Sequence, residues 1–228
     1  MKAFLIIYLT CMAAFILLTD LSRYAAKKNS DKLIDTIYNG GKECLLLKKQ
    51  FWGIAALSFP VIFYFTSNHI TQKLLSITLD GYWICLWIIA MLLSIFISNK
   101  ATASQLKNLK QQNRPVTKPL NVIAYFTGRI VFLFLYELFF RGVLLFSTIA
   151  IAGNVISIVI NIALYTALHA YCTTKEIIAT VPFGIVICLL SIASNSVWPA
   201  VLSHIIIAIT TDWIIVFSIK KSYKLSIA

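Results

Sequence analysis

The sequence predicts an all-α membrane protein, a multi-pass helical bundle of about seven transmembrane helices. Of its 228 residues, 60% are hydrophobic and only 12% are charged, and the mean hydropathy is +0.86. These values lie far outside the range of soluble domains. The chain also contains several apolar stretches, each long enough to cross roughly 30 Å of hydrocarbon at about 1.5 Å per residue. A soluble enzyme and a disordered chain are both excluded.

The expected spans follow one another with short or basic connections. They are residues 3–19, 51–67, 82–98, 121–147, 154–171, 176–194 and 197–219. We interpret the first as a retained span because no small-residue cleavage site follows it. Gly153 separates the fourth span from the fifth, and Lys118-Pro119 ends the basic loop before the fourth. We divide the chain into N-terminal helices with basic loops (1–120) and a C-terminal core (121–228).

The net charge of +12 is concentrated in alternate connections between the spans. On one side, seven Lys and Arg lie in 20–50, five in 99–120, one in 172–175 and three after 219; on the other side, one lies in 68–81 and Lys2 precedes the first span. By the positive-inside rule, the N-terminus is outside and the C-terminus cytoplasmic. The basic residues are therefore expected to face anionic lipid headgroups, and no nucleic-acid partner is predicted.

The ionisable side chains within the spans are few, and each is costly to place in lipid. Glu137 and Arg141 are four residues apart, so they share one face of a helix. On spacing alone, the pair could simply be a buried ion pair that fixes helix register. His169 could likewise be a hydrogen-bonding residue between helices, as well as a catalytic one.

Spacing brings two of these residues to one depth. Glu137 and His169 each lie 16 residues from Gly153, so a hairpin turning at Gly153 would place carboxylate and imidazole side by side. That depth is about 24 Å from the outer turn, near the cytoplasmic end, and such a pair can activate a water. His204 fits less well, because a straight seventh helix would leave it roughly 14 Å above Glu137. Either the turn at 195–199 enters the bundle, or the seventh span begins at another residue.

Cysteine and histidine spacing indicates no metal framework. The five cysteines include no C-x-x-C pair, and no H-E-x-x-H motif occurs. No cofactor is predicted, and a divalent metal is left open.

The C-terminal core contains three motifs: Tyr136-Glu137-x-x-x-Arg141, Tyr165-x-x-x-His169, and Trp198-Pro199-Ala200 ahead of His204. In this order and on membrane helices, they resemble the CAAX protease and bacteriocin-processing family of intramembrane endopeptidases. The family carries Glu-Glu-x-x-x-Arg, Phe-x-x-x-His and His-x-x-x-Asn. The resemblance covers about residues 120–215 and implies an intramembrane protease core with Glu137, Arg141, His169 and His204 as its site residues.

Two positions depart from the family pattern. Tyr136 replaces the first glutamate, which in the family is thought to activate water together with the histidine of the second motif. Ala208 replaces the asparagine thought to bind the oxyanion. Adjacent helical positions differ by about 100°, so Glu137 cannot simply take the place of the missing glutamate. The pattern predicts weakened or lost protease activity.

Two main functions therefore remain open beside a small transporter or channel component, against which the sequence shows no inverted repeat of broken helices. One is a cytoplasm-facing endopeptidase that cleaves a membrane-associated peptide, with Glu137 or its water as base, His169 as partner and His204 at the oxyanion. The other is a catalytically silent relative that uses the same bundle to bind a membrane partner. Both predict an integral multi-pass protein, and the resemblance implies a prokaryotic cytoplasmic membrane.

Overall fold

The computed structural model describes residues 2–27, 33, 43–67, 76, 80–111, 121–169 and 174–227. Every element within these ranges is helical, which confirms the predicted all-α class. The helices are α1 (Lys2–Lys27), α3 (Glu43–Ser67), α5 (Gly81–Gln111), α6 (Val122–Glu137), η1 (Leu138–Leu145), α7 (Phe146–Leu168), α8 (Thr174–Ser194) and α9 (Trp198–Ile227).

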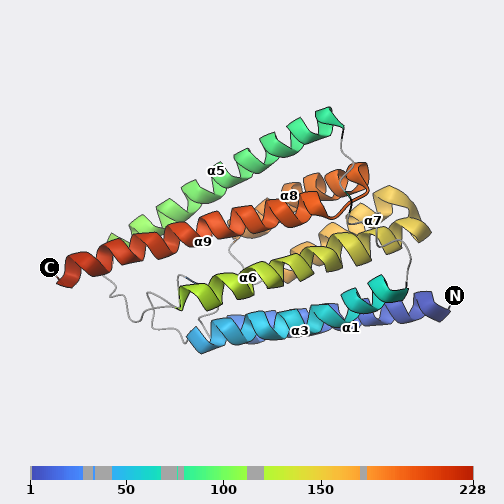
Figure 1. Ribbon diagram of the computed structural model, residues 1–228, viewed down its shortest axis with the longest axis horizontal. Coiled ribbons are helices and arrows are strands. Elements are labelled where there is room, and N and C mark those ends of the chain that lie inside the picture. Colours follow the sequence, from blue (N-terminus) through green and yellow to red (C-terminus); the bar gives the residue numbers. More distant parts are fainter. Residues whose placement is uncertain are drawn as a thin grey trace.

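The helices form an elongated bundle, and most of them run roughly along its long axis (Figure 1). α1 packs beside α3, α3 packs on α6, and α6 packs on α9. On the other side of α9 lie α5 and α8, while α7 packs on α8 and η1. The two ends of the chain lie at opposite ends of the bundle (Figure 1).

Five helical stretches of the described residues are long and apolar enough to cross a membrane. They are Leu46–Thr66, Gly81–Ser104, Val122–Leu168, Ile177–Ser194 and Trp198–Ser218, with a shorter apolar helix at Leu9–Leu21. This confirms a multi-pass membrane protein, while the count of seven spans stays a prediction. Helices α5 and α9 continue past the predicted limits at residues 98 and 219, because polar and basic residues continue a helix even where they end an apolar span.

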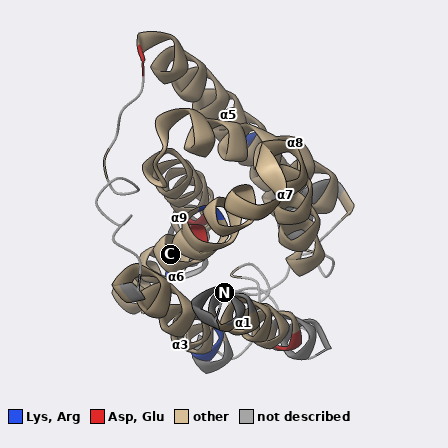
Figure 2. Cartoon of the chain, turned by 90° about the vertical axis from the view of Figure 1, so that its right-hand side faces the viewer, with Lys and Arg blue, Asp and Glu red and all other residues tan. Residues whose placement is uncertain are grey.

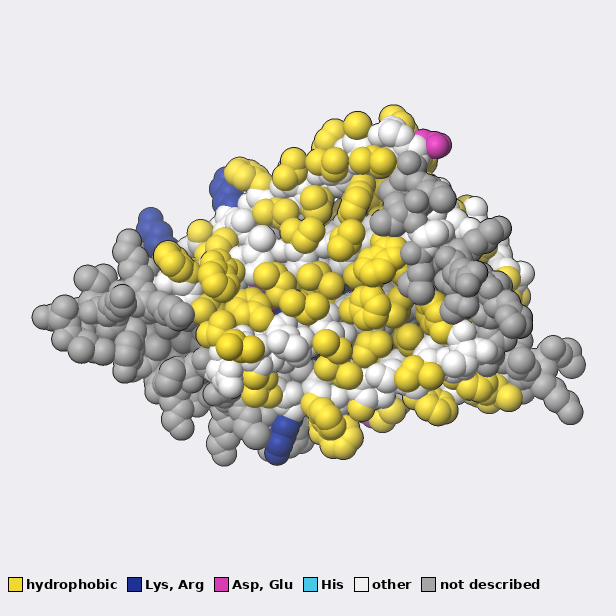
Figure 3. Space-filling view, in the orientation of Figure 1, with side chains coloured by type: hydrophobic (Ala, Val, Ile, Leu, Met, Phe, Trp, Pro, Cys, Tyr) yellow, Lys and Arg dark blue, Asp and Glu magenta, His cyan; other side chains and the backbone are white. Residues whose placement is uncertain are grey.

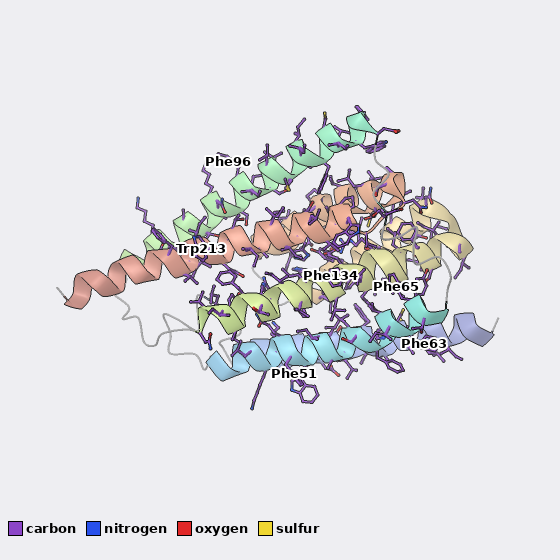
Figure 4. All side chains as sticks on the ribbon, viewed as in Figure 1. Phe51, Phe63, Phe65, Phe96, Phe134 and Trp213 are labelled. Atoms are coloured by element: carbon purple, nitrogen blue, oxygen red, sulfur yellow. The ribbon has the colours of Figure 1, made fainter. Side chains whose placement is uncertain are left out.

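The outer surface of the bundle is apolar. Figure 3 shows hydrophobic side chains covering most of the described area on one face. Phe51 and Phe96 are 63% and 64% exposed, and they point away from the bundle on opposite sides in Figure 4. None of residues 81–101 in α5 is buried. Large exposed apolar surface of this kind fits contact with lipid.

Within α7, the chain reverses at Gly153, which divides the 47-residue apolar stretch into two arms. Gly153 has φ 76° and ψ 173°, a conformation open almost only to glycine. The predicted hairpin turn at this residue is therefore present, and it returns α7 along η1.

Candidate active site

Glu137 and Arg141 form an ion pair in the centre of the bundle. Glu137 is the last residue of α6, Arg141 lies in η1, and neither side chain is exposed. Nη1 of Arg141 lies 3.0 Å from Oε2 of Glu137. Viewed along the bundle, charged residues of both signs lie together near its middle (Figure 2). Because an unpaired charge at this depth would be costly, each residue stabilises the other.

His204 on α9 contacts the second oxygen of the same carboxylate. Its Nδ1 lies 2.5 Å from Oε1 of Glu137. The prediction that His204 lies roughly 14 Å from Glu137 for a straight seventh helix is therefore wrong, and the re-entrant alternative describes the structure. The physical cause is the connection between α8 and α9.

This connection turns inside the protein. Asn195 adopts a left-handed conformation with φ 46°, and the backbone N–H of Ser196 donates to the carbonyl of Ser191 at 3.1 Å. The hydroxyl of Ser196 accepts from the backbone N–H of Trp198 at 3.3 Å and so caps the start of α9. Val197 is completely buried. α9 thus begins within the bundle, which brings His204 to the depth of Glu137.

His169 lies at the end of α7, and its contacts differ from those of His204. Its Nδ1 lies 2.9 Å from the backbone carbonyl of Tyr165, and the two rings are 4.8 Å apart. His169 also interacts electrostatically with Glu137. The imidazole whose nitrogen lies at hydrogen-bonding distance from Glu137 is that of His204, where the hairpin argument placed His169.

The aromatic residues of the first two motifs surround this cluster. Tyr136 is 5% exposed, with its ring centroid 5.8 Å from those of both His204 and Tyr165. The guanidinium carbon of Arg141 lies 4.4 Å from the ring centroid of Tyr165, a cation–π contact. Ala208 is also buried and contributes no hydrogen-bond donor.

A buried amide, overlooked from the sequence, lies behind Arg141. Nδ2 of Asn161 on α7 donates to the carbonyl of Phe140 at 2.6 Å, and Oδ1 of Asn161 accepts from the thiol of Cys188 at 3.5 Å. A sequence signal was present: Asn161, Tyr165 and His169 are spaced by four residues and so form one stripe on α7.

Asp212 belongs to a second polar cluster between α6 and α9. It accepts a hydrogen bond from the hydroxyl of Tyr125 at 2.8 Å, and its Oδ2 lies 3.3 Å from Nε of Arg129. Asp212 lies eight residues beyond His204, about 12 Å along α9. Its contacts mark it as a link between α6 and α9.

The arrangement can polarise an imidazole. A carboxylate that accepts from Nδ1–H holds histidine in the tautomer whose Nε2 accepts a proton. Glu137 is fully buried, whereas the side chain of His204 is 16% exposed. Among the described residues, no group of three or more His, Cys, Asp or Glu could hold a metal ion.

Comparison with known families identifies part of this core. Residues 117–210 match the family model described as Type II CAAX prenyl endopeptidase Rce1-like. The matched range contains Glu137, Arg141, His169 and His204. No curated protein and no solved structure matches the chain. The family match confirms the resemblance predicted from the three motifs.

Proposed function

We propose that the chain, whose residues 117–210 match the Rce1-like CAAX prenyl endopeptidase model, is a slow intramembrane endopeptidase that cleaves a membrane-associated peptide. The contact that carries this proposal is the one between Nδ1 of His204 and Oε1 of Glu137. In this proposal Glu137 orients His204, and Arg141 holds Glu137 in place. The roles first expected for the two histidines are thereby exchanged.

The proposed reaction needs one water and no change in oxidation state. Nε2 of His204 takes a proton from the water as its oxygen attacks the peptide carbonyl carbon, and the carbonyl oxygen becomes an oxyanion. His169, protonated on both ring nitrogens, donates from Nε2 to that oxyanion while its Nδ1 donates to the carbonyl of Tyr165. Ala208 cannot fill this role. When the oxyanion collapses, the C–N bond breaks and the amine leaves with the proton from His204. The products are a carboxylic acid and an amine.

The two departures from the family pattern set the expected rate. Loss of one oxyanion donor commonly lowers kcat by about a hundredfold to a thousandfold. A misplaced general base costs about a hundredfold or more. With Tyr136 and Ala208 in place, cleavage should therefore be orders of magnitude slower than by an enzyme carrying the complete motifs.

A second candidate is a catalytically silent subunit that binds a membrane partner. Two observations favour it: both carboxylate oxygens of Glu137 are engaged within the protein, and the buried ring of Tyr136 lies beside His204. In this case Glu137, Arg141 and His204 serve the fold alone.

A comparison of new peptide termini separates the two candidates without a guessed substrate. Membranes would be taken from cells carrying the wild type, His204→Ala, His169→Ala, or no copy. His69→Ala is the control, because His69 is the third histidine of the sequence and lies outside the three motifs. Termini present in the wild type and His69→Ala but lost in the other two variants are expected for the endopeptidase. Termini equal in wild type and His204→Ala would reject it and favour the silent subunit.

We also propose the finer topology: seven spans, with the N-terminus outside and the C-terminus in the cytoplasm of a prokaryotic cell. Support comes from the reversal at Gly153, which divides one long stretch in two, and from the location of the chain ends at opposite ends of the bundle. Reporter fusions after residues 100 and 228 should both report a cytoplasmic location, and a fusion after residue 153 an external one.

A further inference from the structure

The segment that carries Arg141 is a π-helix. η1 spans Leu138–Leu145, and all eight of its residues are buried. In a π-helix each carbonyl accepts from the N–H five residues later, an arrangement that is rare in proteins and concentrates at functional sites. Hydrogen bonds and contacts from other helices can stabilise such a segment.

One such interaction comes from Asn161. Its Nδ2 lies 2.6 Å from the carbonyl oxygen of Phe140, and that carbonyl shares one planar peptide unit with the backbone nitrogen of Arg141. A hydrogen bond that holds this carbonyl therefore also fixes the orientation of the peptide plane that contains the Arg141 nitrogen and Cα, and with it the direction of the Arg141 side chain. Tyr165 lies one turn further along α7. Its ring centroid is 4.4 Å from the guanidinium carbon of Arg141.

The orientation of the Asn161 amide is fixed from its other side. The thiol of Cys188 on α8 donates to Oδ1 of Asn161 at 3.5 Å, so the amide nitrogen must face Phe140. Asn161 and Cys188 are both fully buried. An amide within an apolar span is unfavourable unless it is hydrogen-bonded, and here its oxygen and its nitrogen each have a partner.

We infer that Asn161 is a positioning residue: by holding the Phe140–Arg141 peptide plane, it sets the Arg141–Glu137–His204 arrangement, and Cys188 sets the amide. The inference deepens the proposed function, because Glu137 and His204 are the proposed catalytic pair. Its readout is the state of the His204 ring and needs no peptide cleavage. It can therefore fail or hold independently of the proposed activity.

The test is nuclear magnetic resonance of the full chain in detergent micelles with ¹⁵N-labelled histidine. The sequence has three histidines, so His204→Gln identifies the His204 ring signals by their loss. In the wild type, the His204 nitrogens should show one fixed tautomer, protonated at Nδ1. In Asn161→Leu they should move toward the averaged positions of an exchanging imidazole, and any peptide cleavage should fall by roughly a hundredfold in kcat with little change in KM.

Ser157→Ala is the matched control. Ser157 is a fully buried polar residue on the same helix, and its hydroxyl donates only within that helix, to the carbonyl of Gly153 at 2.7 Å. Its removal should leave the His204 signals unchanged. Unchanged signals in a folded Asn161→Leu protein would overturn the inference.

If Asn161→Leu does not fold, Asn161→Ala decides the question. It removes the amide donor to Phe140 with a smaller side chain and leaves in place the thiol of Cys188, which also interacts with Arg141. A shift of the His204 nitrogens in the same direction supports the positioning role. His204 signals identical to the wild type would mean that the amide serves folding alone, and would reject it.

Discussion

Gly142 and Val197 approach each other so closely that a Cβ atom on Gly142 would lie 3.3 Å from Cγ1 of Val197. Gly142 lies in η1, and Val197 lies in the buried connection that precedes α9. The missing side chain at Gly142 thus makes room for the connection to enter the bundle. His204 follows Val197 by seven residues, about two helical turns, so this contact sets the depth of the imidazole.

Replacing Gly142 by Val should therefore push the connection outward. We expect a loss of about 1–3 kcal/mol in the free energy of unfolding, as for other overpacked sites. Denaturant titration in detergent measures this loss. Gly81→Val is the control, because a Cβ at Gly81 would meet nothing within 4 Å. Equal losses for the two variants would contradict the close contact.

The Glu137–Arg141 pair should show strong coupling in a double-mutant cycle. Glu137→Gln alone leaves the guanidinium of Arg141 buried without its counter-ion, which typically costs about 3–5 kcal/mol. Removing both charges with Glu137→Gln and Arg141→Met should restore a large part of that stability. The measurement is the free energy of unfolding of the four proteins. Additive losses would mean that the two charges do not stabilise each other.

Asp212→Asn should affect the fold far more than the proposed chemistry. It weakens the links to Tyr125 and Arg129, and because the Arg129 side chain is 31% exposed, we expect a loss of only about 1 kcal/mol. Any cleavage should continue at a similar rate, since Asp212 lies about 12 Å along α9 from His204. Abolished cleavage in a stable Asp212→Asn protein would instead identify Asp212 as the base.

Tyr136→Glu restores the residue that the family pattern has at this position. We expect the cleavage rate to rise by about a hundredfold, since a positioned carboxylate base contributes on that order. Stability should fall, because a carboxylate would replace an aromatic ring that packs against Tyr165 and His204. Tyr136→Phe is the control and should leave the rate unchanged. A lower rate in Tyr136→Phe would show that the phenol hydroxyl itself takes part.

Composition and apolar length were sufficient to predict the all-helical membrane class, and Gly153 was sufficient to predict the reversal within α7. These features depend on local chemistry: burial of backbone polar groups in lipid, and the conformational freedom of glycine. Glu137 and Arg141 were also paired from spacing alone, because four residues span one helical turn.

The position of His204 could not be predicted in the same way. It depends on the contact of Val197 with Gly142, which are distant in the sequence, and on the serines that hold the connection between α8 and α9. The π-helix depends similarly on a donor from another helix, Asn161. Helical periodicity assumes a regular helix, so it gives no sign of one that departs from 3.6 residues per turn.

Two ion pairs, Glu137–Arg141 and Arg129–Asp212, can form at different times during synthesis. Glu137 and Arg141 lie one turn apart, so their charges can neutralise each other as soon as that helix forms in the translocon. Arg129 must wait for Asp212, which the ribosome adds 83 residues later. Until α9 enters the membrane, the long side chain of Arg129 can only extend toward the lipid headgroups at the start of its span. An arginine without a counter-ion costs up to about 3 kcal/mol in the free energy of insertion. The last helix thus neutralises a charge carried by a helix inserted well before it.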